Sequence, residues 1–226
     1  MSPSPILHLF RRPWREVPIA FVDTETTGLI PGVDGVCQVG IARFESGRYV
    51  AARSWLVDPG RPIPAEATSV HGIGDEAVRG APKLGDVLAS HDAVALMQGA
   101  QPGGYNTSFD RSMLPHGFGG TEGSWPWVDC LTLVRVVDRF ARGKGRHRLE
   151  VSCERHGITL AKAHDAGADA KAAGELFFKI MADQQANGTE FETLGDLLAW
   201  LETRRIDEWH RFTDWLSQQP PLQQSA

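Results

Sequence analysis

Two acidic residues stand where a short apolar run of the chain stops. Asp23 and Glu25 follow the run Ile19–Val22 and are separated by a single residue. In an extended chain, side chains two residues apart point to the same side, so both carboxylates would face one way. Carboxylates held together repel each other unless a cation neutralises them, and their oxygen atoms suit Mg²⁺ or Mn²⁺. The pair predicts a metal site or, alternatively, a turn at a strand end with a capping aspartate.

A third carboxylate, Asp110, lies in mid-chain within the sequence GYNTSFD, residues 104–110. A glycine-rich stretch precedes it and the residues around it favour a helix, so we expect Asp110 at a helix start beside Phe109. The segment is open to a second interpretation, because Ser108 or Asp110 could simply be the N-cap of that helix.

A histidine and two further aspartates occur late in the chain, in the sequence HDAGADA from His164. Five residues of helix turn through about 500°, so His164 and Asp169 would not share a face if both were helical. We therefore expect His164 in the preceding loop, Asp165 near the helix start and Asp169 one turn in. A loop histidine beside a metal-binding helix suits a general base, because its unperturbed pKa lies near neutrality. A surface helix start is the alternative.

The elements that must position these residues follow from the apolar pattern. Short apolar runs bounded by polar residues and glycine are typical of buried strands, and Glu45-Ser46-Gly47 is a good hairpin turn. The strand candidates are Ile19–Val22, Val36–Phe44, Arg48–Val57 and Trp127-Val128, and the helix candidates are residues 65–71, 83–89, 108–114, 131–140, 149–156 and 165–182. Strands followed by helices within one unit indicate an α/β or α+β sheet flanked by helices.

The two ends of the chain differ in character from its middle. The first residues are rich in Pro and Arg, and a polar break precedes the last helical pattern. The boundaries that follow are residues 1–17 for a flexible N-terminal arm, 18–183 for the main domain, 188–217 for a C-terminal helical extension and 218–226 for a disordered tail.

The C-terminal extension carries one apolar face. From Phe191 to Leu216, apolar residues recur at steps of three to five, which indicates one or two amphipathic helices. That face packs on the protein's own core or docks a partner, and Trp200, Trp209 and Trp215 keep the second option open because tryptophan is favoured at interfaces.

Composition excludes several classes of protein. With 226 residues, 42% of them hydrophobic and 23% charged, the chain is typical of a globular protein long enough to bury a core. No window approaches the ~18 consecutive apolar residues of a membrane span, and the N-terminus lacks a secretory pattern. Cys37, Cys130 and Cys153 lie far apart and suit a reducing compartment, so we expect a cytoplasmic protein with no membrane partner.

The net charge of −5 argues against a protein that coats nucleic acid by bulk charge. It leaves room for a local basic patch, and the stretch Arg135–Arg148 carries six Arg or Lys residues and one Asp. This stretch is either a solvated helix end and loop or a contact for a nucleic-acid backbone.

Taken together, the three acidic motifs resemble those of the DEDD superfamily of 3′–5′ exonucleases, in the DnaQ-like subtype that has a histidine before the last aspartate. The epsilon proofreading subunits of bacterial DNA polymerase III belong to this family. The first motif stands here as VDTETTGL, and PIPAEATSVHGI at residues 62–73 is similar to the family's segment between the first two motifs. The resemblance spans about Ile19 to Ile180 and implies a ribonuclease H-like mixed β-sheet flanked by α-helices.

The resemblance also implies a site with two Mg²⁺ ions, for which Mn²⁺ can substitute. Asp23 would bridge both ions, Glu25 and Asp169 would complete the ion that holds the attacking water, and Asp110 would serve the ion near the leaving 3′ oxygen. His164 would take the proton from that water. Two such ions ~3.5–4 Å apart clamp the attacking and leaving oxygens of an in-line displacement.

Further residues match family positions that contact the terminal nucleotide. Three of them, Thr26, Thr27 and Leu29, follow the first two ligands and would bound that nucleotide. The other three, His71, Asn106 and Phe109, would lie near its sugar and base. Phe109 could instead be a core residue. Within the basic stretch, the side chains expected to contact the sugar-phosphate backbone of the nucleic acid are Arg142, Lys144 and Arg146.

Two departures from the family pattern stand out. Tyr105 precedes Asn106 where relatives often have histidine, and Gly167 replaces a larger apolar residue in the third motif. The first is expected to alter substrate contacts and the second to loosen local helix packing.

The leading hypothesis is a metal-dependent 3′–5′ exonuclease of DNA, preferably single-stranded, that releases nucleoside 5′-monophosphates in proofreading or repair. Proofreading would require a separate polymerase subunit, bound through the C-terminal helices. The alternatives are an exoribonuclease that trims RNA and an inactive copy retained for binding nucleic acid or a polymerase. Presence of all four carboxylates and the histidine argues against an inactive copy.

Overall fold

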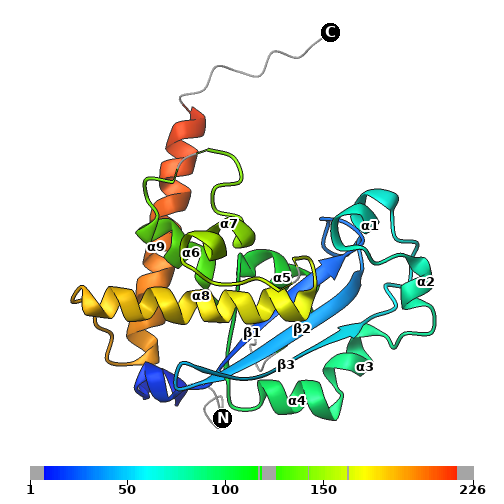
Figure 1. Cartoon of the computed structure of the whole chain (residues 1–226), viewed down its shortest axis with the longest axis horizontal. Coiled ribbons are helices and arrows are strands. Elements are labelled where there is room, and N and C mark those ends of the chain that lie inside the picture. Colours follow the sequence, from blue (N-terminus) through cyan, green and yellow to red (C-terminus); the bar gives the residue numbers. More distant parts are fainter. Residues whose placement is uncertain (1–7, 117, 119–125, 142, 162, 218–226) are drawn as a thin grey trace.

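The computed structural model describes residues 8–116, 118, 126–141, 143–161 and 163–217, and its centre is one five-stranded mixed sheet (Figure 1). The strands are ordered β3-β2-β1-β4-β5. Antiparallel pairing joins β1 to β2 and β2 to β3, whereas β4 pairs parallel to β1 and β5 parallel to β4. Their bounds are Ile19–Thr26 for β1, Val36–Glu45 for β2, Arg48–Leu56 for β3, Gln101–Gly104 for β4 and Val128–Asp129 for β5. The predicted ribonuclease H-like α/β class is confirmed.

Strand β1 runs further than the apolar run predicts. The expected end was Asp23, but β2 continues to pair with β1 as far as the contact of Thr26 with Val36. The two carboxylates therefore lie within a hydrogen-bonded strand rather than in a turn after it, because cross-strand pairing supplies what local hydrophobicity does not.

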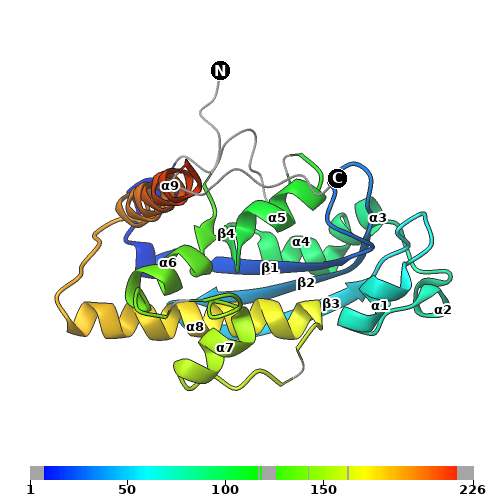
Figure 2. The same cartoon turned by 90° about the horizontal axis from the view of Figure 1, so that it is seen from above.

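Helices cover both faces of the sheet (Figure 2). On one face, the long α8 packs across β1 and β2 and is accompanied by α6 and α7, while α3, α4 and α5 cover the other. The helices before α9 are α1 (Ala65–His71), α2 (Asp75–Val78), α3 (Leu84–Leu88), α4 (His91–Met97), α5 (Thr107–Met113), α6 (Cys130–Val137), α7 (Leu149–Arg155) and α8 (Ala166–Ala186). Short helices α2 and α4 are absent from the sequence prediction.

Each face of the sheet has its own apolar core, as the alternation of side chains along β1 requires. Phe21 packs with Phe44 and with Phe177 of α8 on one face. Ala20 and Val22 point the other way, into the cluster beneath α3 and α4.

The expectation of a flexible N-terminal arm is wrong for residues 8–17. Two short 3₁₀ helices, η1 (Leu9–Arg11) and η2 (Trp14–Glu16), bury Leu9 and Trp14 in the α8-side core. The Trp14 ring stacks on Phe178 at 6.3 Å between centroids, and the Leu194 amide donates to the carbonyl of Arg12 at 3.0 Å. The apolar side chains of Leu9 and Trp14, which stand among prolines and arginines in the sequence, pack into this core and fix the segment against it. Residues 1–7 lie outside the described part.

The C-terminal extension is a single helix, α9 (Leu194–Ser217), whose two halves differ. Leu194, Leu197, Leu198 and Leu201 in its first half are buried in the same core as Trp14. In its second half Trp209 is 61% exposed. The first half is therefore part of the main core. The Trp215 side chain and residues 218–226 lie outside the described part.

Within the described ranges, no helix is both long enough and apolar enough to span a membrane.

Candidate active site

Strand β1 and helix α8 supply the centre of the site. Asp23 and Glu25 lie two and four residues beyond Phe21 on β1, so they share the face on which α8 packs. Asp23 pairs with Gly40 of β2, where an added Cβ would lie 2.1 Å from the backbone of Ala166. Only glycine at that position allows the start of α8 to lie directly on the sheet beside the carboxylates.

The start of α8 is fixed by polar contacts. Asp165 is the N-cap, its side chain accepting from the amide of Ala168 at 3.1 Å, and the Ala166 amide donates to the buried Gln38 side chain at 2.9 Å. Asp169 lies in the first turn. His164 precedes the helix in left-handed backbone with a φ of +61°, and its amide donates to Asp169 Oδ2 at 3.0 Å. The structure thus places these residues where the spacing predicts.

One carboxylate reaches the site from the opposite layer. Asp110 of α5 is 3% exposed, and its Oδ1 accepts a hydrogen bond from Thr24 Oγ1 at 2.8 Å. Thr24 lies between Asp23 and Glu25 on β1 and points to the α5 side of the sheet. On the α8 side, ligand atoms of Glu25, His164 and Asp169 all lie within 4.8 Å of one another.

Burial raises the pKa of all four acids, and the charges of neighbouring acids add to the effect. Desolvation and the charges of Asp110, Asp169 and Glu25 raise the pKa of Asp23 well above its usual value. Desolvation, assisted by Asp169 and Asp110, raises the pKa of Glu25 to about 8. Burial raises the pKa of Asp110 to about 7 against the opposing hydrogen bond from Thr24, and that of Asp169 to about 6. Together the four groups form a strongly negative site that holds protons when no cation is present.

The donor set fits a divalent cation. Asp169 Oδ1 is buried and has no hydrogen-bond partner among the described residues, although acceptors buried in this way are normally satisfied. The carboxylate oxygens of Glu25 and Asp169, which lie in one small volume with the His164 ring, are the kind of ligand that Mg²⁺ and Mn²⁺ prefer. A cation here would satisfy that oxygen and offset the repulsion that raises the pKa values.

Sequence reasoning missed two contacts of the site. Glu150 in the first turn of α7 places Oε1 3.4 Å from His164 Nε2, and Thr24 restrains Asp110. Neither residue belongs to a spacing pattern, because both contacts join segments brought together only by the tertiary fold. The sequence feature that comes closest to indicating a role for Thr24 is its position between the two acidic residues of the first motif.

The residues after the first motif shape a loop beside the site. Thr26 Oγ1 donates to the Gly28 carbonyl at 2.7 Å, and Thr27 Oγ1 donates to Asp34 Oδ1 at 3.2 Å. Leu29, at the outside of this loop, is 78% exposed. The threonines therefore stabilise the loop, while Leu29 is the member of the predicted trio that presents its side chain to solvent.

His71 ends α1 and is buried against β1. Its Nδ1 accepts from the Ile73 amide at 3.1 Å, so the ring proton is on Nε2, which lies 3.3 Å from the Thr26 carbonyl. Burial lowers the pKa of His71. The ring thus ties the segment after α1 to the end of β1. Asn106 is exposed with a left-handed φ of +61°, and Phe109 is half-buried.

The basic stretch joins α6 to α7 and leads into the site. Lys144 and Arg146 are exposed, and the Arg146 carbonyl accepts from Arg155 Nη2 at 2.8 Å. Arg142 lies outside the described residues. Because α7 begins at the end of this stretch and carries Glu150, the stretch borders the carboxylates.

Both departures from the family pattern have structural consequences. The Tyr105 hydroxyl donates to the His147 carbonyl at 2.7 Å and lies 2.9 Å from Ser152 Oγ, so this side chain anchors the end of the basic stretch. At Gly167 an added Cβ would lie 3.1 Å from Ser54 Cβ. The expected loosening is therefore wrong, because the missing side chain allows α8 to approach β3 closely.

A mixed sheet of this order, with carboxylates gathered from β1, α5 and α8, defines a ribonuclease H-like nuclease fold with an acidic site. The family model described as RNase_T exonuclease matches residues 20–177. The chain belongs to this exonuclease family.

Relatives and solved structures agree with that assignment. A DNA polymerase III subunit epsilon-like protein of Rhodobacter capsulatus is 35% identical over 80% of this chain, and a PolC-type DNA polymerase III of Latilactobacillus sakei is 31% identical over 73%. The matches span only 26% and 11% of those proteins. Exonuclease X in complex with 5′-overhanging duplex DNA has a TM-score of 0.61 at 24% identity, covering 80% of this chain and 99% of that one. Exonuclease I of E. coli in complex with a dT13 oligonucleotide has the same TM-score at 20% identity, covering 76% and 42%.

Proposed function

We propose that this protein is a divalent-metal-dependent 3′–5′ exonuclease that removes nucleotides from the 3′ end of DNA and releases nucleoside 5′-monophosphates. The observation that carries the proposal is the meeting of four carboxylates from three distant segments, with a histidine beside them and a buried Asp169 oxygen that has no hydrogen-bond partner in the described part of the chain. Such a cluster is unfavourable without a cation, and phosphodiester hydrolysis is chemistry that it suits.

Each side chain has a distinct task in this proposal. Asp23, Glu25, Asp110 and Asp169 would hold the cations, with Mg²⁺ the proposed ion and Mn²⁺ its substitute. Bound there, the metal would polarise the scissile phosphate and lower the pKa of a coordinated water. His164 would accept the proton of the attacking water. Its backbone amide donates a hydrogen bond to Asp169, and its ring lies beside Glu150.

The loop after β1 and the start of α5 are proposed to receive the terminal nucleotide. Leu29 offers an exposed apolar surface, and Asn106 and Phe109 lie one turn or less from Asp110 on the same segment. Thr26, Thr27 and His71 are proposed to support the loop after β1, to which their hydrogen bonds connect them. Arg142, Lys144 and Arg146 are proposed to hold the phosphates of the strand that leads to the site.

DNA is the proposed substrate because the relatives are named as DNA polymerase subunits, and a single strand because an oligonucleotide accompanies one structural neighbour. Another neighbour is titled for recognition of a histone mRNA stem-loop by a 3′-exonuclease, so the fold accommodates both nucleic acids. We propose a role in proofreading or repair in the cytoplasm, with a polymerase subunit bound through the exposed half of α9.

The test uses 5′-labelled single-stranded DNA and RNA of one sequence, each incubated with Mg²⁺, Mn²⁺ or EDTA. We expect a ladder that shortens from the 3′ end of DNA, requires the metal and disappears in Asp23→Asn. Asp86→Asn, an exposed change on α3, is the matched control and should retain full activity. Faster shortening of RNA would reassign the substrate, and no shortening of either would overturn the catalytic proposal.

A further inference from the structure

A cavity of about 700 Å³ lies between α9 and the helices of the main domain, apart from the acidic site. Its walls combine apolar side chains of Phe10, Leu198 and Leu201 with Ser108 and Arg111 of α5. Ligand pockets in proteins fall in this range of size and are mostly apolar with a few polar groups. The cavity is thus large enough for a small organic molecule.

The carboxylates at this cavity already have partners. Asp129 Oδ1 accepts from the amides of Leu131 and Thr132 at 2.9 and 3.3 Å, and its Oδ2 accepts from Thr107 at 3.1 Å. Glu202 receives two hydrogen bonds from Arg205, at 2.5 and 2.9 Å. These anions are satisfied within the protein.

Arg111 has no such direct partner among the described residues, although the charge of Glu202 lies near enough to attract it. Its guanidinium makes no hydrogen bond or ion pair with the described residues, and it is half-buried near the second guanidinium of Arg205. The Trp127 ring forms part of the same wall, and its buried indole Nε1 lacks an acceptor among the described residues. Arg111 is the donor that faces the occupant of this cavity without a direct partner among the described residues, so a complementary occupant carries acceptor atoms.

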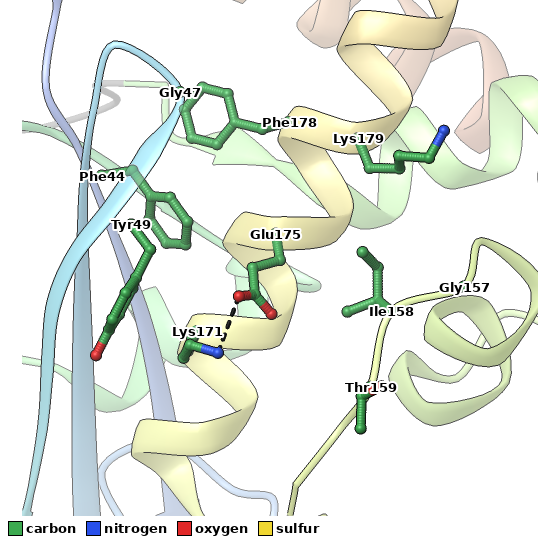
Figure 3. Close-up of a pocket in the computed structure, with 10 residues that line it drawn as sticks. All are labelled: Phe44, Gly47, Tyr49, Gly157, Ile158, Thr159, Lys171, Glu175, Phe178 and Lys179. Carbon is green, nitrogen blue, oxygen red and sulfur yellow. Dashed lines mark ion pairs between the residues drawn. The ribbon is translucent and has the colours of Figure 1, made fainter.

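An open hollow beside α8 differs from the cavity beside α9 in how its cations are paired (Figure 3). Its two lysines are matched on their own helix, Lys171 by Glu175 at 2.9 Å and Lys179 by Asp183 at 2.6 Å. That hollow therefore has no unmatched cation, whereas the cavity beside α9 does.

We propose that the cavity between α9 and α5 binds a small organic anion, with its carboxylate or phosphate on Arg111 and its apolar body against Phe10, Leu198 and Leu201. Arg111 would supply a charge-assisted hydrogen bond, which is among the stronger polar contacts available to a protein. The inference does not depend on the proposed exonuclease activity.

The test is a titration of the full chain in EDTA with 4-phenylbutyrate, followed by NMR of the tryptophan indole N–H signals. Trp127 is assigned by the signal that Trp127→Phe removes. We expect a saturable shift of that signal, and binding at least tenfold weaker for the neutral 4-phenylbutanamide. The phosphate arm uses phenyl phosphate in the same titration, and tighter binding there identifies the head group as phosphate.

Two variants keep the proposal falsifiable. Arg111→Met should weaken 4-phenylbutyrate binding at least tenfold, whereas Arg79→Met, an exposed change just after α2, should leave it unchanged. Ala199→Phe, which fills the cavity from the exposed side of α9, should abolish binding even if Arg111→Met does not fold. No saturable shift, or equal binding by Arg111→Met, Arg79→Met and wild type, would overturn the proposal.

Discussion

At the scale of single residues, the site is organised by side chains that hold other side chains. Thr24 restrains Asp110, the His164 amide restrains Asp169, and Glu150 lies at hydrogen-bond range of the His164 ring. A general base is effective only when it is held in reach of the proton that it accepts. The geometry therefore gives Glu150 a positioning role.

Glu150→Gln is expected to lower kcat about tenfold with little change in KM. The neutral amide leaves the His164 ring less firmly oriented but does not touch the substrate. The variant should therefore lose transition-state stabilisation, which lowers kcat, while substrate binding stays nearly the same. Steady-state kinetics on an oligonucleotide checks this split. Glu154→Gln, an exposed change on the same helix, is the control. A rise in KM alone would show that Glu150 acts on substrate binding instead.

At the scale of elements, the site depends on how closely α8 approaches the sheet. The start of α8 lies on β2 at Gly40, so the positions of Asp165 and Asp169 follow from one glycine rather than from their own segment. Close-packed interiors transmit such changes because they have no spare volume.

Gly40→Ala is expected to destabilise the protein by about 1–3 kcal/mol, as overpacking does, and to reduce divalent-cation affinity by displacing the start of α8. Urea denaturation and calorimetric titration with Mn²⁺ measure the two effects. Gly85→Ala on α3, where an added Cβ meets nothing within 4 Å, should leave cation affinity unchanged. Equal cation affinity in both variants would contradict the argument.

The two halves of α9 make a second expectation at this scale. Leu197 is fully buried in the main core, so Leu197→Ala should lower the free energy of unfolding by about 2–5 kcal/mol. Trp209 is 61% exposed, and Trp209→Ala should change the free energy of unfolding by no more than about 0.5 kcal/mol. Denaturant melts of both variants give the comparison. A large loss for Trp209→Ala would place the second half of α9 in the fold rather than at an interface.

At the scale of the whole molecule, the acidic site opposes folding when it is empty. Asp110, Asp169 and Glu25 hold protons in the folded state to about pH 7, 6 and 8, whereas their ordinary pKa values are 3.8, 3.8 and 4.5. The folded state thus binds more protons than the unfolded state between about pH 4 and 8. The contribution of these groups to the free energy of unfolding is therefore most favourable below about pH 4. It falls as the pH rises through their folded-state pKa values.

Metal-free protein is therefore expected to lose stability between pH 5 and pH 8, and Mg²⁺ or Mn²⁺ should restore more of it at pH 8 than at pH 5. Thermal melts in EDTA and in saturating cation at both pH values measure this. Glu25→Gln removes one of the repelling charges and should raise the Tm of the metal-free protein at pH 8. A metal-free Tm that rises with pH, or a cation effect that is equal at both values, would contradict the expectation.

Local sequence determined the identities of the candidate ligands and most of the elements that carry them. Periodicity of two placed Asp23 and Glu25 on one face of a strand, and the helical turn placed His164 before α8 and Asp169 within it. These features depend on contacts within a few residues, so spacing records them. Helices α1 and α7 end beside Gly72 and Gly157, two glycines in left-handed backbone that are local stop signals, for the same reason.

Only the tertiary structure decided which distant groups meet. Pairing with β2 extended β1 through Glu25, and packing of two layers brought Thr24 to Asp110 and Glu150 to His164. Burial of Leu9 and Trp14 under α8 and α9 turned an apparently loose arm into core. Each of these outcomes depends on contacts between residues ten or more positions apart. Neither the cost of burial nor the repulsion among the carboxylates exists until the chain has folded.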